Sequence, residues 1–319
     1  MNDSFKRNIN YLRISVTDRC DLRCIYCMPE CGVEKFEHAK ILSVEEIETI
    51  VNEAVKLGIT KIRLTGGEPL VKKGLIDICR NISKHPEIKE LCITTNGMLL
   101  KDFAKDLKDA GVTRFNISLD TLDNEKFKKI TRCKMYDKPV DRIFEGIELA
   151  ESLGFKNFKF NTVLLGGIND DEISDFIEMT KDKDYCFRFI ELMPIGEAMN
   201  WDKEAFITND DVLERFPELE FVEDGNVSKI YRKPGYKGTI GLISPMSHRF
   251  CSECNRMRLT SDGKLKACLH SKKETLIKGL SSEEIYEAIK KEIENKPENY
   301  KLGLDNFSDS ERSMSQIGG

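Results

Sequence analysis

The sequence predicts an α/β protein in which six β-α units form a partial barrel, followed by a smaller extension. Up to about residue 192, short apolar β-rich runs alternate with helical patterns, the helical patterns have recognisable ends, and polar motifs follow the strands. Repeated β-α units give a parallel sheet with right-handed crossovers, and six units favour a partial (βα)6 barrel of the TIM type over a complete one. The expected strands are Tyr11–Val16, Ile59–Thr65, Glu90–Thr95, Thr113–Leu119, Phe158–Leu164 and Cys186–Glu191.

Capping residues and helix stops mark helices between these strands. A serine followed three residues later by glutamate is typical of a capping box, a proline of a first helical turn, and a glycine of a helix end. The signals are Ser43 with Glu46 (capping box), Pro139 (first turn), Asn169-Asp170 (N-terminal cap), and Gly58 and Gly111 (helix ends). In such a fold the chemistry lies at the carboxyl ends of the strands, where the polar motifs stand.

The rhythm changes beyond about residue 195. The extension contains, in order, β runs at Ser228–Arg232 and Thr239–Ser244, a second cysteine group, and helices from about Glu274 and Ser282. No linker or low-complexity stretch separates it from the barrel. We therefore expect a barrel at residues 1–195 and an extension at 196–319 that packs over the open side of the sheet.

Size and composition indicate a soluble globular protein. The 319 residues carry a formal net charge of −5, which gives no electrostatic footprint for nucleic acid. There is no apolar run of about 18 residues that could span a membrane, and the polar start lacks the apolar core of a signal peptide. Eleven cysteines without an export signal favour metal binding in a reducing compartment over disulfides, so we expect a cytoplasmic protein.

The run Cys20-Asp-Leu-Arg-Cys24-Ile-Tyr-Cys27 follows the first strand and supplies three thiolates. A structural zinc or an ordinary four-iron cluster takes four protein ligands, so three cysteines leave one metal position open for an exogenous ligand. Two alternatives stay open on spacing alone. Cys31 would complete a closed four-cysteine cluster, and His38 would complete a zinc site.

Cys251, Cys254 and Cys268 form a second group of three thiols. Asp262-Gly263 between them is a two-residue hairpin signal. Such a hairpin would place Cys268 opposite Met257 and close to Cys251 and Cys254.

A zinc ribbon with His270 or His248 as fourth ligand is the alternative for this group. Arg256 and Arg258 alternate onto one face of the strand and set two permanent cations beside the metal, which suits an open cluster with an anionic substrate.

After the second strand, Gly66-Gly67-Glu68-Pro69 marks a place where the backbone comes close to a ligand. Together with the first cysteine run, this motif resembles the signature of the radical S-adenosylmethionine (SAM) superfamily. The resemblance implies a [4Fe–4S] cluster on Cys20, Cys24 and Cys27 whose free iron binds SAM. It also implies a SAM site made of Tyr26, Gly66, Gly67, Glu68, Ser118 and Met193.

Three further features together resemble the GTP 3′,8-cyclase family of molybdenum cofactor biosynthesis. They are the second cysteine group, the run Asn255-Arg256-Met257-Arg258 after it, and the terminal Gly318-Gly319. The resemblance implies a second [4Fe–4S] cluster on Cys251, Cys254 and Cys268 that binds the guanine of GTP. The GTP contacts it implies are Arg13, Arg63, Thr94, Lys159, Arg256, Met257 (through its backbone) and Arg258. Guanidinium groups suit a triphosphate because they bind its oxygens in a bidentate fork.

By the same resemblance, reductive cleavage of SAM gives a 5′-deoxyadenosyl radical that takes the C3′ hydrogen of GTP. The C3′ radical then attacks C8 and gives (8S)-3′,8-cyclo-7,8-dihydroguanosine 5′-triphosphate, with no residue acting as an acid–base pair. The polar tail Ser313–Gly319 would be frayed unless held, and in this family Gly318 and Gly319 reach the active site.

The resemblance also implies partners. They are a flavodoxin- or ferredoxin-type electron donor, cyclic pyranopterin monophosphate synthase downstream, and a second copy of the chain in a homodimer. A twin-cluster radical SAM enzyme that modifies a peptide or a tetrapyrrole is the alternative; it would not need Arg256 and Arg258.

Overall fold

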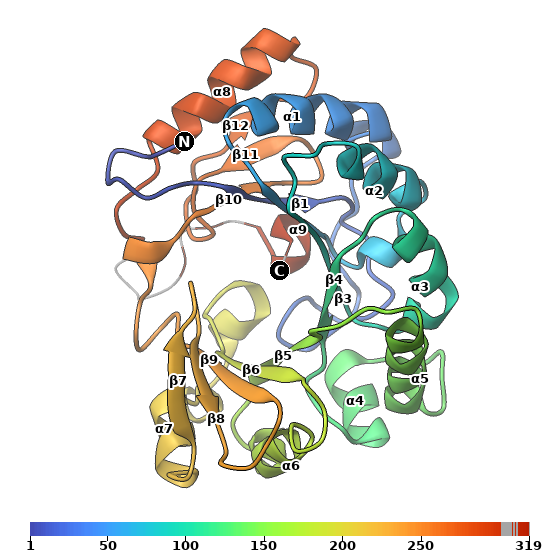
Figure 1. Ribbon diagram of the computed structural model, residues 1–319, viewed down its shortest axis with the longest axis vertical. Coiled ribbons are helices and arrows are strands. Elements are labelled where there is room, and N and C mark those ends of the chain that lie inside the picture. Colours follow the sequence, from blue (N-terminus) through green and yellow to red (C-terminus); the bar gives the residue numbers. More distant parts are fainter. Residues whose placement is uncertain (301–307, 309, 311, 319) are drawn as a thin grey trace.

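Figure 1 shows the computed structural model of the protein, which describes residues 1–300, 308, 310 and 312–318. The six strands expected in the first part of the chain are all present, and the two β runs expected in the extension are strands as well. The strands are β1 (Tyr11–Ser15), β2 (Lys61–Thr65), β3 (Glu90–Thr95), β4 (Arg114–Ser118), β5 (Lys159–Leu164), β6 (Cys186–Glu191), β7 (Glu220–Asp224), β8 (Lys229–Arg232), β9 (Thr239–Ile243), β10 (Arg256–Leu259), β11 (Lys264–Lys266) and β12 (Thr275–Leu276).

Helices connect the parallel strands and lie outside the ring that the strands form (Figure 1). The α-helices are α1 (Val44–Lys56), α2 (Leu75–Ser83), α3 (Leu100–Asp109), α4 (Asn124–Thr131), α5 (Pro139–Ser152), α6 (Ile173–Glu178), α7 (Asn209–Arg215), α8 (Ser282–Glu294) and α9 (Met314–Ile317). Short 3-10 helices are His38–Lys40, Pro69–Val71, Asp170–Glu172, Gly196–Asn200, Lys203–Ala205 and Cys251–Glu253. In the described part of the chain, no helix is long and apolar enough to cross a membrane.

Most of the predicted helix boundaries are confirmed. Ser43 and Glu46 form a capping box at the start of α1, and Pro139 opens α5. Gly58 and Gly111 adopt the left-handed conformation just beyond the ends of α1 and α3. Asn169 precedes a 3-10 helix, but its side chain makes no cap hydrogen bond and instead donates to the carbonyls at Asp120 and Val163.

One open sheet of twelve strands organises the fold, in the order β12-β11-β10-β1-β2-β3-β4-β5-β6-β9-β8-β7. The strands from β10 through β1–β6 to β9 are parallel, and the outer strands pair antiparallel at each edge. The extension therefore joins the same sheet at both of its edges, β10 beside β1 and β9 beside β6. The predicted boundary at residue 195 falls just after β6, and strands from both sides of it share this sheet.

Side-chain alternation along the strands separates the core from the site. Leu12, Ile14, Ile62 and Leu64 are fully buried in the apolar cluster, whereas Arg13 lies between two of them on the other strand face. Burial of each such apolar side chain stabilises the fold by roughly 1.5–3 kcal/mol. The apolar face thus holds the sheet to the outer helices and leaves the inner face for polar groups.

Two details of the extension differ from the prediction. The segment at Glu274 does not begin a helix; it leads into β12, which pairs with β11, and the next helix is α8. The hairpin between β10 and β11 is also one residue out of the expected register. Arg258 pairs with Lys266, so Cys268 does not lie opposite Met257.

The reason is the loop type of that hairpin. Gly263 adopts φ +78° and its N–H bonds to the carbonyl of Thr260, which makes a three-residue loop with glycine in the left-handed position. Asp262 has a further role here, because it is ion-paired with Arg312.

Candidate active site

A cavity of about 340 Å³ lies on the inner face of the sheet, a volume typical of small-molecule sites. Both cysteine groups line it, although more than 200 residues separate them in sequence. The thiols that line the cavity are Cys20, Cys24, Cys27, Cys251, Cys254 and Cys268.

The first thiol triad, Cys20, Cys24 and Cys27, lies in the loop after β1. Backbone bonds fix this loop, including those from Arg23 and Ile25 to the end of α4. Burial raises the pKa of all three thiols, that of Cys27 to about 11, so the metal-free protein holds them protonated. Metal binding at this triad must therefore release protons.

The second thiol triad, Cys251, Cys254 and Cys268, differs in its electrostatics. Burial would raise the pKa of Cys254, but the cations of Lys296 and Arg256 and hydrogen bonds lower it to about 7. Burial raises the pKa of Cys268. One of these thiols is thus easily ionised near neutral pH, as a metal ligand must be.

The residues considered as a fourth metal ligand differ in whether they reach the cavity. Cys31 and His38 are exposed and do not line the cavity, and His248 is exposed beside Asp210. His270 lines the cavity, with Nδ1 3.1 Å from the Ser308 hydroxyl. Its pKa is lowered to about 4 by burial and by nearby cations, which keeps it neutral.

Within residues 1–300, 308, 310 and 312–318, no group of three His, Cys, Asp or Glu side chains is placed to hold a single metal ion.

The glycine motif after β2 is packed against the first cysteine loop. Gly66 adopts φ +152°, and a Cβ there would lie 2.5 Å from the carbonyl oxygen of Thr17. A Cβ on Gly67 would lie 2.4 Å from the carbonyl oxygen of Arg19, just before the first cysteine. Only glycines permit this approach, which is also sealed by the bond from Glu68 N to Arg19 O at 2.8 Å.

Buried carboxyl groups organise this side of the cavity. Glu68 accepts hydrogen bonds from Thr95 Oγ1 and Asn96 N, both at 2.7 Å. Burial and the neighbouring Asp21 nevertheless raise its pKa to about 8. The six predicted SAM-site residues, Tyr26, Gly66, Gly67, Glu68, Ser118 and Met193, all line the cavity.

Asp120 has a role that the sequence did not reveal. It accepts from the Tyr26 hydroxyl at 2.7 Å and from Val163 N at 2.9 Å, and thereby ties the cysteine loop to β5. Burial raises its pKa to about 6. Its position at the end of β4, directly after Ser118-Leu119, was the available signal.

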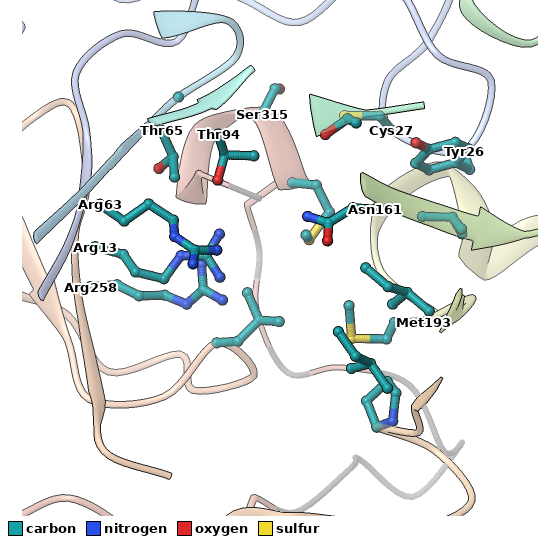
Figure 2. A pocket seen from close by; sticks show the side chains of 18 of the residues that line it. Arg13, Tyr26, Cys27, Arg63, Thr65, Thr94, Asn161, Met193, Arg258 and Ser315 are labelled. Carbon is teal, nitrogen blue, oxygen red and sulfur yellow. The ribbon is translucent and has the colours of Figure 1, made fainter. Parts of the chain in front are cut away.

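A row of arginines forms the opposite wall. Parallel pairing puts Arg258 of β10, Arg13 of β1 and Arg63 of β2 in register on adjacent strands. Figure 2 shows the three side chains reaching into the pocket from one side, with Tyr26 and Met193 across from them. Burial and the neighbouring Arg258 lower the pKa of Arg13 well below its ordinary value, and burial and Arg256 lower that of Arg258 to about 10. Like charges held together in this way favour an anionic ligand.

The remaining predicted GTP contacts fall into two groups. Thr94 and Arg256 line the cavity. Lys159 does not; it lies on the same face of β5 as the lining residue Asn161, two positions earlier, where burial and Arg114 lower its pKa to about 8. The Met257 side chain is fully buried in the core, so its backbone alone remains for a contact.

Arg188 is a second residue that the sequence analysis missed. It lies on β6 in register with Asn161, lines the cavity, and has a pKa lowered to about 9 by burial and Arg63. With its amide oxygen turned toward the arginines, Asn116 accepts from both Arg188 and Arg63. An isolated arginine on a strand carries no sequence signal of such a role.

The C-terminal tail up to Gly318 is held in the site and is not frayed. Met314 and Ser315 of α9 line the cavity, and Arg258 Nη1 donates to Gly318 O at 2.6 Å. Gly318 is so close to β2 that a Cβ would lie 2.3 Å from Thr65 Oγ1. The prediction for Gly319 lies outside the described residues.

The donor set fits the groups that the motifs imply. Several buried polar atoms of the lining residues have no hydrogen-bond partner among the described residues. Each such atom destabilises the protein by roughly 1–3 kcal/mol unless a ligand forms a hydrogen bond with it. They are Thr94 Oγ1, Asn161 Oδ1, Arg63 Nε, Arg188 Nε and Arg256 Nη2. Soft thiolates suit iron–sulfur clusters, and the arginines suit phosphate oxygens.

The partial barrel and its first thiol triad define an enzyme of the radical SAM class, and comparison with known proteins agrees. Residues 14–180 match the radical SAM superfamily, and residues 185–302 match the family described as Molybdenum Cofactor Synthesis C. Among solved structures, Streptococcus suis SuiB bound to its precursor peptide SuiA has a TM-score of 0.59 at 17% identity, over 83% of this chain and 60% of that one. This last likeness shows the fold alone.

Curated relatives narrow the class. GTP 3′,8-cyclase of Alkaliphilus oremlandii is 48% identical over the full length of both chains. The protein of the same name from Peptoclostridium acidaminophilum is 47% identical over 99% of this chain and 98% of its own. The chain belongs to the GTP 3′,8-cyclase family.

Proposed function

We propose that this chain cyclises GTP to (8S)-3′,8-cyclo-7,8-dihydroguanosine 5′-triphosphate, an early step of molybdenum cofactor biosynthesis. The observation that carries the proposal is the composition of one cavity: two thiol triads and a row of buried arginines all line it. A radical SAM enzyme for an uncharged substrate has no use for that row.

The first triad and the glycine motif would hold a [4Fe–4S] cluster and SAM. When bound, these groups supply the 5′-deoxyadenosyl radical that abstracts hydrogen from C3′ of GTP. Glu68, with Gly66 and Gly67 beside it, would receive the SAM amino group, and Asp120 fixes the Tyr26 ring through its hydroxyl. These residues thereby orient the reagent before chemistry begins.

The second triad would hold a [4Fe–4S] cluster that binds the purine, and the cations would hold the triphosphate. Arg13, Arg63 and Arg258 form one wall, and Arg188 with Lys159 extends the positive charge toward β5 and β6. Each guanidinium can bind two phosphate oxygens at once. Their mutual repulsion is relieved when the anion binds, so the site selects a polyphosphate.

The tail would exclude water and other hydrogen donors from the radical. α9 lies inside the ring of strands (Figure 1), and Gly318 contacts Arg258 on the triphosphate wall. We further propose a cytoplasmic location, a flavodoxin- or ferredoxin-type donor as reductant, cyclic pyranopterin monophosphate synthase as the next enzyme, and a homodimer.

The test is anaerobic incubation of the reconstituted protein with SAM, GTP and dithionite. We expect 5′-deoxyadenosine together with a cyclised nucleotide, both detected by mass spectrometry. Replacement of Arg256 and Arg258 by alanine should abolish the nucleotide product, whereas Arg80→Ala, on the exposed face of α2, serves as the matched control. Deoxyadenosine without a new nucleotide would retain the superfamily and reject GTP as substrate.

A further inference from the structure

Two buried cations contact the loops of the second thiol triad, and the proposed reaction assigns them no role. Lys296 follows α8 and is 3% exposed, and Arg7 precedes β1 and is 8% exposed. Both come from segments distant in sequence from the cysteines, yet both contact the loops that carry them.

Lys296 joins the two ends of the hairpin that carry Cys254 and Cys268. Its ammonium donates to the carbonyl of Arg256 at 2.8 Å and to that of Ala267 at 2.5 Å. Its positive charge also lowers the pKa of the Cys254 thiol. The side chain therefore links the two strand ends next to Cys254 and Cys268 and fixes their spacing.

Arg7 fixes the third cysteine and the segment that carries Lys296. Its Nη1 donates to the carbonyl of Cys251 at 2.8 Å and to that of Glu298 at 2.9 Å, and its Nη2 donates to Pro297 O at 2.7 Å. The buried carboxylate of Asp3 holds its Nε at 2.6 Å. The N-terminal segment is thus a structural part of the second triad.

The charge of Lys296 is the feature that packing alone does not explain. A buried ammonium is costly to desolvate, and an apolar side chain of similar length would fill the same space without that cost. The titratable neighbours of the first triad are carboxyl groups instead, namely Asp21, Glu68 and Asp120. Cations therefore border the second triad, whereas carboxyl groups border the first.

We propose that Lys296, braced by Arg7, is a positioning residue of the second triad and supplies the fixed positive charge that offsets the negative charge of its thiolates. The inference rests on the proposed function, because it requires an iron–sulfur cluster at that triad. A positive charge at this place favours the reduced, more negative form of the cluster, so its removal lowers the reduction potential.

The experiment isolates the second cluster by replacing Cys24 and Cys27 with alanine in the full chain. In this parent we expect about four iron atoms per chain, as one cluster supplies. Lys296→Gln keeps a donor for the carbonyls but loses the charge, Lys296→Arg keeps the charge, and Lys291→Met changes an exposed lysine of α8 as control. Iron content, circular dichroism before iron is added, and a potentiometric titration followed by electron paramagnetic resonance are the measurements.

For Lys296→Gln we expect a reduction equilibrium about tenfold less favourable, a downward shift of about 59 mV for one electron. Lys296→Arg and Lys291→Met should remain close to the parent. An unchanged potential in Lys296→Gln, with iron retained, would overturn the proposal and leave the second cluster standing. A parent chain without iron would instead reject the proposed function at its second triad. A third outcome is that Lys296→Gln and Lys296→Met both fail to fold before iron is added, as judged by circular dichroism. That result would show that Lys296 is needed only for folding, and it would also overturn the proposal.

Discussion

The arginine row predicts that one substitution has opposite effects on stability and on ligand binding. Arg13 lies between Arg258 and Arg63 on adjacent strands, which are about 4.8 Å apart in a sheet. Two unit charges at about 5 Å repel by roughly 3 kcal/mol at an effective dielectric constant of about 20. Arg13→Met removes both repulsions, and the loss of other contacts of Arg13 offsets part of the gain.

We therefore expect the metal-free Arg13→Met protein to be more stable by about 1–3 kcal/mol. At about 2–3 °C per kcal/mol, the midpoint of thermal unfolding should rise by roughly 2–9 °C. GTP binding should weaken by roughly 10- to 150-fold, because one or two charge-assisted hydrogen bonds worth about 1.5–3 kcal/mol are lost.

The assays are differential scanning fluorimetry of the metal-free protein and isothermal titration calorimetry of the reconstituted protein with GTP and with guanosine. Guanosine, which has no phosphate, should bind both proteins equally. Arg80→Met on α2 controls for the loss of any arginine. A lower unfolding midpoint in Arg13→Met, or GTP affinity equal to that of the parent, would refute the argument from charge repulsion.

Three further predictions concern the opposite wall. Gly67→Ala puts a Cβ 2.4 Å from Arg19 O and displaces the first cysteine loop, so iron per reconstituted chain should fall from about eight to about four; full iron content would contradict this. Asp120→Ala leaves the Tyr26 hydroxyl and a backbone N–H without an acceptor, and we expect a loss of about 1–3 kcal/mol in urea unfolding and a higher KM for SAM; an unchanged KM would separate Tyr26 from SAM binding. Burial raises the pKa of Glu68 to about 8, so between its ordinary value near 4.5 and 8 the folded chain binds a proton that the unfolded chain lacks. The stability of the metal-free protein should fall as pH rises through that window, by up to about 1.4 kcal/mol per pH unit, and Glu68→Gln should remove this slope in urea titrations.

Most of the barrel could be predicted from local patterns in the sequence. The strands and caps of the first six units depend on short-range periodicity and on capping chemistry, which single residues such as Ser43 and Pro139 express directly. The thiol triads and the glycine motif could be recognised in the sequence because metal binding and close backbone approach themselves require that spacing.

The pairing of strands that are distant in sequence could not be predicted in the same way. Nothing near Arg256 indicates that β10 pairs with β1, or that the segment after Glu274 joins the sheet as β12. The hairpin register depended on whether Asp262-Gly263 made a two- or a three-residue loop, and the residue pair alone suits both. Arg188 became a site residue only through its register with β5.

β1 is the first strand of the sheet to be translated, and its partner β10 is one of the last. β1 therefore cannot pair with β10 until most of the chain has been made. Tyr11 and Arg256 are partners, so about 250 residues are translated between them, which takes roughly 12–50 s at ordinary elongation rates. During that interval the nascent chain presents an unpaired strand edge, and such edges invite aggregation. We expect newly synthesised chains to depend on chaperones until β10 emerges, and chains that stop short of it to be cleared by proteolysis.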